Sequence, residues 1–117
     1  MFRERLKDIV ERCDGAMGGV VMGFDGIVVD SYTLTSGTDV QTIGMELAFV
    51  LIQVRKASEI LEVGKLEEIS IRSEQLVFLV RILSDEYFLG IALRPSGNFG
   101  KGRHLMRMAV PELRANL

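Results

Sequence analysis

The chain has 117 residues and a mass of 13.0 kDa, which is the size of one domain, so we expect a single domain over residues 1–117. Hydrophobic residues make up 48% of the chain and charged residues 26%, which excludes an intrinsically disordered or collagen-like chain. The net charge is -2 and no basic tract exceeds two residues, which argues against a nucleic-acid partner because phosphate binding needs a clustered positive surface.

Two further features bear on location and redox state. The longest apolar run, over residues 47–52, is far shorter than the ~20 residues that span a bilayer, and no charged-then-apolar leader opens the chain. Cys13 is the only cysteine, which excludes an internal disulfide and, by itself, a zinc or iron–sulfur site. We therefore expect a soluble, cytoplasmic protein with no transmembrane segment.

The N-terminal third predicts a helix followed by a hairpin. Apolar residues recur every three or four positions, at Phe2, Leu6, Ile9, Val10 and Cys13. This spacing predicts an amphipathic helix over residues 3–13. Two apolar runs follow, residues 17–23 and 27–33, and the Asp25-Gly26 pair between them is a strong hairpin signal.

The rest of the chain predicts a long helix, three strands and a last helix. Asp39 is a good N-cap, and nothing breaks a helix from there to Val63. Strands are expected over residues 66–73, 76–83 and 87–93, and a helix from Phe99 to the end that is disturbed near Pro111. The order α-β-β-α-β-β-β-α predicts an α+β sandwich, with one five-stranded antiparallel sheet between helices.

The long helix carries two apolar stripes instead of one. At 100° per residue, the first consists of Val40, Ile43, Leu47, Val50, Leu51, Val54, Ala57 and Leu61. The second lies roughly opposite and consists of Met45, Phe49, Ile52, Ile60 and Val63. A helix that is apolar on opposing sides must be buried on both. We expect the first stripe to cover the chain's own sheet and the second to form the interface of a symmetric homodimer with paired long helices. The alternative is that the N- or C-terminal helix packs over the second stripe within one chain.

A third sector of the helix lies between the stripes. It carries Gln41, Gly44, Ala48, Arg55, Glu59 and Glu62. Gly44 and Ala48 predict a shallow, open patch edged by charge, and two such patches side by side in a dimer would form a groove for a rigid partner. The alternative is a solvated helix face that happens to hold two small residues.

Few residues in the chain have catalytic potential. Cys13 lies on the apolar stripe of the first helix and is expected to pack as a small hydrophobe, and His104 is expected to face solvent or cap a helix. No Gly-x-Ser-x-Gly elbow is present, and Glu67 and Glu68, adjacent in a strand, point to opposite faces and cannot share a metal. We therefore expect no enzyme, no metal site and no cofactor.

A glycine-rich segment, residues 97–102, follows a strand and opens the last helix. Backbone N–H groups at such a position can bind phosphate. The segment lacks the Gly-Lys-Ser/Thr of a P-loop, and the chain has no parallel βαβ unit to hold it. Close packing of the last helix on the sheet is the favoured explanation of these glycines.

Taken together, these segments resemble the roadblock/dynein light-chain domain family, which has a profilin-like sandwich. Residues 15–30 look like its first hairpin, with a glycine, an apolar run, Asp-Gly and a second apolar run. The long helix after a polar loop and the closing strand-turn-helix of residues 89–105 are also similar. The resemblance covers residues 3–110 and is strongest to the stand-alone, MglB-like type of bacteria and archaea.

The resemblance implies a homodimer in which two five-stranded sheets join and the long helices lie side by side on one face. It also implies that this face docks a Ras-like small GTPase and modulates its nucleotide cycle without a catalytic residue of its own. Gln41, Gly44, Ala48, Arg55 and Glu59 are the GTPase-facing candidates carried over, and Arg55 as an arginine finger is an alternative. A structural adaptor in a motor- or membrane-associated assembly is the alternative function.

Overall fold

Eight elements make up the computed structural model, which describes residues 1–117. In chain order they are α1 (Phe2–Arg12), β1 (Ala16–Gly23), β2 (Val28–Thr33), α2 (Val40–Ile60), β3 (Glu68–Arg72), β4 (Val77–Ile82), β5 (Tyr87–Leu93) and α3 (Phe99–Ala115). The predicted order of elements is confirmed, and each predicted strand overlaps an observed one. The last helix also continues through Pro111, where the sequence suggested a disturbance.

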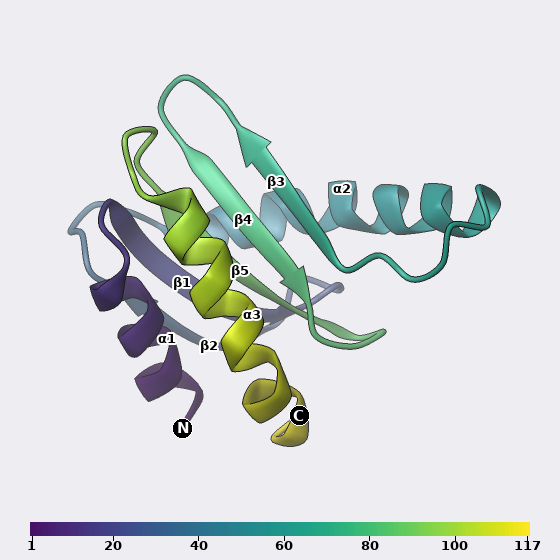
Figure 1. Cartoon of the computed structure of the whole chain (residues 1–117), viewed down its shortest axis with the longest axis horizontal. Helices are drawn as coiled ribbons and strands as arrows, with labels where there is room; N and C mark the ends of the chain where they lie inside the picture. The colour runs from purple at the N-terminus through teal and green to yellow at the C-terminus, as the bar shows by residue number, and fades with distance from the viewer.

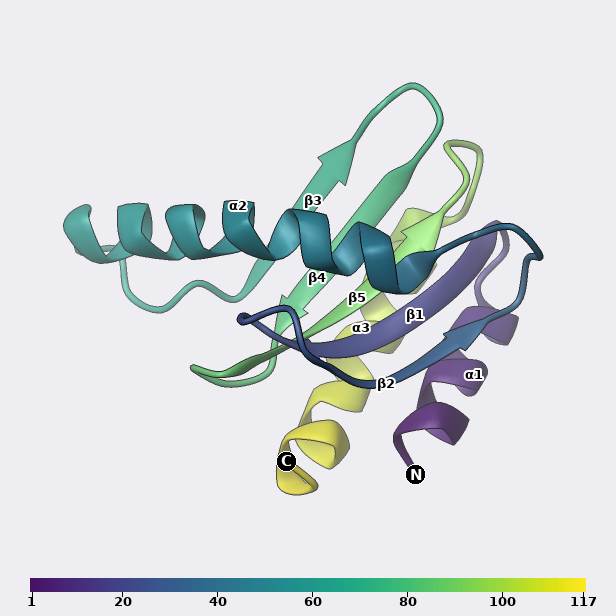
Figure 2. The same ribbon diagram turned by 180° about the vertical axis from the view of Figure 1, so that it is seen from behind.

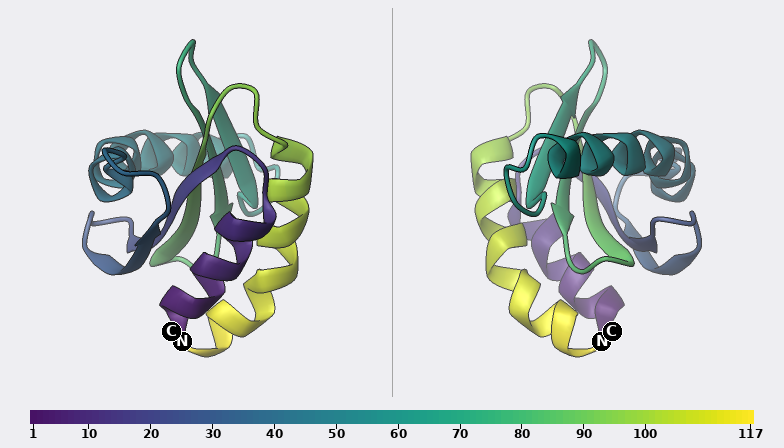
Figure 3. Two further views of the ribbon diagram at one scale, coloured as in Figure 1. Left: turned by 90° about the vertical axis from the view of Figure 1, so that its left-hand side faces the viewer. Right: turned by 90° about the vertical axis from the view of Figure 1, so that its right-hand side faces the viewer.

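The strands form one antiparallel sheet in the order β2-β1-β5-β4-β3. Helices α1 and α3 lie together on one face of this sheet and α2 lies alone on the other (Figure 1 and Figure 3). The expected three-layer α+β sandwich is confirmed. Because β2 and β3 are the edge strands, each leaves one row of backbone N–H and C=O groups without a partner strand.

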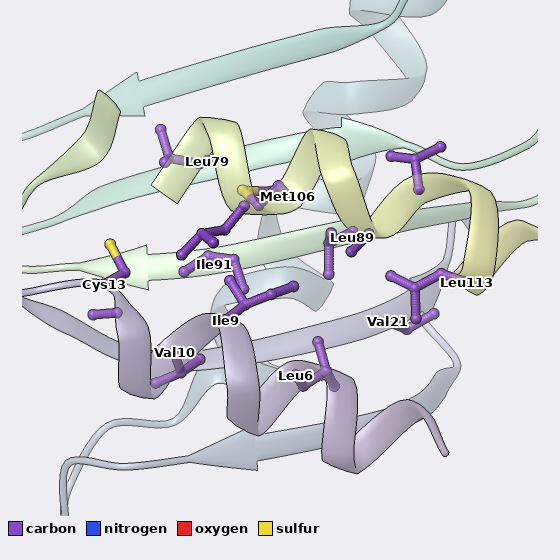
Figure 4. Close-up of a cluster of buried hydrophobic side chains, with 14 of the residues drawn as sticks. Leu6, Ile9, Val10, Cys13, Val21, Leu79, Leu89, Ile91, Met106 and Leu113 are labelled. Atoms are coloured by element: carbon purple, nitrogen blue, oxygen red, sulfur yellow. The ribbon is translucent and has the colours of Figure 1, made fainter. Parts of the chain in front are cut away.

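The larger core cluster lies between the sheet and the α1–α3 layer. Figure 4 shows side chains from both helices meeting those of the sheet, among them Leu6, Ile9, Leu89, Ile91 and Met106. All five are almost completely buried. Burying side chains of this size stabilises the fold by roughly 1.5–3 kcal/mol each, so this layer anchors the sheet.

Cys13 belongs to the same cluster, as expected of a small hydrophobe. Its thiol lies 3.2 Å from the carbonyl oxygen of Asn98, to which it donates a hydrogen bond. Burial raises the pKa of this thiol above its ordinary value, and the nearby charge of Asp14 adds to the shift. A thiol that stays protonated is a poor nucleophile, so Cys13 has a structural role.

The glycine-rich segment before α3 is explained by packing. Gly15 has φ +87° and touches Gly97 so closely that a Cβ on Gly15 would lie 2.4 Å from the Gly97 Cα. Asn98 caps α3, because its side chain accepts a hydrogen bond of 3.1 Å from the Lys101 N–H. The glycines thus join the start of β1 to the start of α3, as the packing interpretation predicted.

Candidate functional site: the exposed face of the long helix

Helix α2 is the element that the sheet supports least. Its first turns lie across the sheet, and its last turns extend past β3 into open space (Figure 1 and Figure 2). Asp39 starts the helix by accepting hydrogen bonds from the Thr42 N–H at 3.0 Å and the Thr42 hydroxyl at 2.7 Å. These bonds lower the pKa of Asp39 below its ordinary value because they favour the charged carboxylate.

The sheet-facing side of α2 differs from the expected one. Val40, Gly44, Ala48 and Leu51 are its buried residues. A Cβ on Gly44 would lie 2.9 Å from Met22 Cε, and Ala48 is only 2% exposed. The expected open patch at Gly44 and Ala48 is therefore wrong. The physical reason is that small residues let the helix backbone approach the sheet closely, so these two positions mark the line of contact.

The burial observed along α2 also changes the expected roles of the two apolar stripes. Of the first stripe, Val40 and Leu51 are buried as expected, whereas Val50 is 44% exposed on the flank of the helix and Leu61, just after the end of the helix, is 69% exposed. Of the second stripe, Ile52 is half-buried and packs on the smaller core cluster under α2. Ile52 therefore contributes to the chain's own core.

The other residues of the second stripe are exposed. Phe49 is 74%, Ile60 81%, Val63 70% and Met45 42% exposed. Neither α1 nor α3 covers them, since both lie on the opposite face of the sheet (Figure 3). The alternative of intrachain cover is therefore wrong. The helix ends at Ile60, three residues before the predicted end at Val63. We call Met45, Phe49 and Ile60, together with Val63 just after the helix, the outer stripe of α2.

A residue from the first hairpin extends this surface. Ile27 is 68% exposed and follows Gly26, where a Cβ would lie 3.8 Å from Met45 Cγ. Ile27 therefore lies near the outer stripe, a position that the sequence alone did not predict. The signal was present in the sequence, because the Asp-Gly turn places Ile27 at the tip of a hairpin, where few residues surround its side chain.

Two of the polar candidates on α2, Arg55 and Gln41, are held by contacts with other elements. The Arg55 guanidinium lies 4.1 Å above the Phe24 ring and donates a 2.7 Å hydrogen bond to the Asp85 carbonyl oxygen. The Gln41 side-chain amide donates to the Ser31 hydroxyl oxygen at 2.8 Å. Glu59 is exposed. Arg55 therefore braces α2 against the first hairpin and the turn after β4, and it is not free to extend from the surface.

Beneath the overhanging end of α2 there is a cleft of about 1190 Å³. Its walls carry four basic and four acidic side chains, namely Arg55, Lys65, Arg81, Arg114, Glu59, Glu62, Glu67 and Asp85. No group of three or more His, Cys, Asp or Glu side chains is placed to hold a metal ion. A broad cleft with balanced charge suits a protein surface better than a small apolar ligand.

Proteins of known structure are similar to this chain over nearly its whole length. The chain is 41% identical to MglC from Myxococcus xanthus over 99% of this chain and 98% of that chain, with a TM-score of 0.72. Its fold also matches a Roadblock/LC7 domain from Streptomyces avermitilis with a TM-score of 0.85 at 14% identity, over 97% and 95% of the two chains. No family model and no curated protein sequence matches it.

The chain belongs to the Roadblock/LC7 family, in which MglC is a relative of similar sequence. A further structure of the same fold is the gliding protein MglB from Thermus thermophilus, with 16% identity over 97% of this chain and 88% of that chain and a TM-score of 0.79. In sequence the chain is thus more similar to MglC than to this MglB. No helix in it is long and apolar enough to cross a membrane.

Proposed function

We propose that the protein is a homodimer that docks a Ras-like small GTPase and modulates its nucleotide cycle. The observation that carries this proposal is the outer stripe of α2, where large apolar side chains are exposed on a face that no other element covers. A folded domain exposes several large apolar side chains along one face of a helix chiefly where another protein binds. The family resemblance supplies the partner class, and the solved MglB with a tetrameric arrangement is a relative in fold that self-associates.

Two features support dimerisation at the β3 side of the molecule. The β3 strand is a free sheet edge, and α2 extends past this same edge (Figure 2). If two β3 edges pair, the overhanging end of each α2 lies over the sheet of the other copy. Ile60, Leu61 and Val63, all at least 69% exposed, are then covered. Val50 lies on the same flank as Leu61 and faces the second α2.

We assign Met45 and Phe49 to the GTPase, because both side chains are exposed on α2 and Met45 lies beside Gly26 of the first hairpin, whose strand β2 is the sheet edge opposite β3. This assignment revises the expectation that they belong to the dimer interface. Ile27 extends the docking surface, and Gln41 and Glu59 flank it with polar groups. Arg55 positions this surface, and its engaged guanidinium disfavours an arginine-finger role.

A second candidate function is an adaptor that binds its partner without altering nucleotide turnover. The burial of Gly44 and Ala48 favours it, since these small residues were the basis for expecting a groove between paired helices. The two functions differ in one observable property. A regulator must bind one nucleotide state of the GTPase more tightly, whereas an adaptor binds both equally.

Capture from the host's own lysate tests the proposed function. With the purified protein as bait, we expect recovery of a Ras-like GTPase that differs clearly between added GDP and a non-hydrolysable GTP analogue. The Phe49→Asp variant should lose this capture, because it places a charge on the docking surface. The matched control is Met108→Asp on α3, which replaces an exposed apolar side chain on the other face of the sheet and should retain it (Figure 3). Equal capture in both nucleotide conditions would support the adaptor instead.

A further inference from the structure

A second exposed surface lies on the face of the sheet opposite to α2. Helix α3 packs over β4 and β5, and no helix covers the edge strand β3 on this face (Figure 1). Ser70 is opposite Leu79 of β4, and Leu79 belongs to the core cluster under α3. Because opposed and alternate residues of paired strands share a face, the polar side chains on the α3 side of this edge are those of Glu68, Ser70, Arg72 and Arg81.

Arginines border this part of the sheet on both sides. One flank of α3 carries Arg103, Arg107 and Arg114, whose spacings of four and seven residues place them on the same side of the helix. The Arg103 Nε donates a 2.7 Å hydrogen bond to the Glu68 carboxylate, so this flank faces β3. We call Arg72, Arg81, Arg103, Arg107 and Arg114 the arginine strip.

The arginine strip holds more positive charge than its own carboxylates neutralise. Its five arginines and the two neighbouring glutamates, Glu67 and Glu68, amount to a net charge of +3, in a chain whose total is -2. Two hydrogen bonds from Arg103 lower the pKa of Glu68, so this carboxylate already has its partner. Arg107 is exposed and takes part in none of the seven ion pairs of the chain. Its charge is therefore available to an anion from another molecule.

Backbone contacts hold the two ends of the arginine strip in place. Arg72 donates to the Pro95 carbonyl oxygen at 3.1 Å, and Arg114 donates to the Leu83 carbonyl oxygen at 2.6 Å. A carbonyl oxygen orients a guanidinium group without neutralising its charge. Because a guanidinium has several N–H donors, both arginines keep donors for an incoming carboxylate.

The length of the arginine strip suits a short peptide. From Phe99 to Arg114, α3 rises about 22 Å at 1.5 Å per residue, which corresponds to about seven residues of an extended chain at about 3.3 Å each. Alternate residues of such a chain lie about 6.6 Å apart, close to the ~6 Å rise between Arg103 and Arg107. At one end Phe99, which is 47% exposed, adds an apolar contact, and at the other end Arg114 lines the cleft beneath α2.

We propose that the arginine strip binds an acidic segment of a partner protein, extended along α3, with its carboxylates paired to Arg107 and the neighbouring guanidinium groups. Arginine suits this role because its planar guanidinium group donates two parallel hydrogen bonds to one carboxylate. The strip lies on the opposite face of the sheet from the outer stripe of α2 (Figure 3). It is therefore independent of the proposed GTPase surface, and one chain can hold both partners at once.

A membrane surface fits this face less well than a peptide does. Helix α1 lies beside α3 in the same layer, and Glu4, Glu11 and Asp14 on and next to α1 are exposed (Figure 3). A flat membrane with anionic lipids would approach these carboxylates, which it repels. A narrow acidic segment contacts only the flank of α3 that faces β3, where the arginines lie.

Fluorescence anisotropy with labelled octaglutamate tests the arginine strip. The wild type should bind this peptide at least about tenfold more tightly than it binds labelled octaglutamine. Arg107→Glu should weaken the binding of octaglutamate at least about tenfold, because it replaces an attracting charge by a repelling one at the centre of the strip. Since Arg107 has no ion-pair partner within the chain, this variant should unfold at the same temperature as the wild type.

Two further variants separate the strip from the overall charge of the chain. Lys7→Glu makes a matched change of charge at an exposed position of α1, which packs over β1 and β2 toward the other edge of the sheet. It should bind octaglutamate with a Kd within about threefold of the wild-type value. Glu67→Gln removes a carboxylate that is 79% exposed beside the strip and should tighten binding about threefold.

Three results would overturn the proposal. The first is equal binding of octaglutamate and octaglutamine, and the second is an equal loss in Arg107→Glu and Lys7→Glu, which would indicate a general effect of charge. The third is binding to vesicles of phosphatidylserine and phosphatidylcholine that depends on Arg107 while octaglutamate does not bind, which would assign the strip to a membrane. None of these results bears on the proposed function, because the assay involves neither the GTPase nor the outer stripe.

Discussion

The Ala48→Arg variant should be unstable, with a free energy of unfolding about 3 kcal/mol below that of the wild type. Ala48 is 2% exposed and belongs to the smaller core cluster between α2 and the sheet. An arginine at this position must either push the helix off the sheet or leave its charge in an apolar layer. Urea denaturation followed by circular dichroism measures the change.

Ala57→Arg is the matched control, since it makes the same substitution at an exposed position of the same helix. We expect its free energy of unfolding to stay within about 0.5 kcal/mol of the wild-type value. Equal stability of both variants would contradict the burial of Ala48 and would restore the open patch as a docking surface.

The second large effect is expected at the overhanging end of α2, where Leu61→Asp should convert the dimer into a folded monomer. Leu61 is 69% exposed in the single chain, so the substitution removes little from the fold. In the dimer, two aspartates would lie against apolar surface without a partner, which should weaken association by about 30-fold or more. Sedimentation equilibrium should then give the 13.0 kDa of one chain in place of twice that mass.

Leu34→Asp is the control for this experiment. Leu34 is a leucine of similar character, 49% exposed, and lies in the connection between β2 and α2. This variant should remain a dimer. Leu34 directly follows β2, the edge strand opposite β3, and the proposed interface leaves that edge free. Dissociation of Leu34→Asp together with Leu61→Asp would indicate a general effect of added negative charge and would count against the overhang as the interface.

The order of elements could be predicted because each local signal agrees with the fold. The Asp25-Gly26 pair between apolar runs predicted the hairpin, and the hydrogen bond from the Gly26 N–H to the Gly23 carbonyl oxygen closes that turn. Asp39 predicted the start of α2 and accepts the capping bond from Thr42. Such signals depend only on neighbouring residues, so one sequence is sufficient to read them.

The site was predicted only in part, because its geometry depends on contacts across the chain. Gly44 and Ala48 appeared to form an open patch, since a small side chain adds little to an apolar stripe although it permits the closest approach of two backbones. The exposure of Leu61 depends on where β3 ends beneath α2, which no local pattern specifies. The bracing of Arg55 by Phe24 and Asp85 joins residues 30 or more positions apart.

The central claim is that the protein recognises the nucleotide state of a small GTPase, and calorimetric titration tests it most directly. The GTPase recovered from the host would be purified, loaded with GDP or with a non-hydrolysable GTP analogue, and titrated with the wild-type protein. We expect the two Kd values to differ by at least tenfold, which corresponds to about 1.4 kcal/mol of coupling between nucleotide and partner. Equal Kd values for both nucleotide states would contradict the claim and leave the adaptor function in its place.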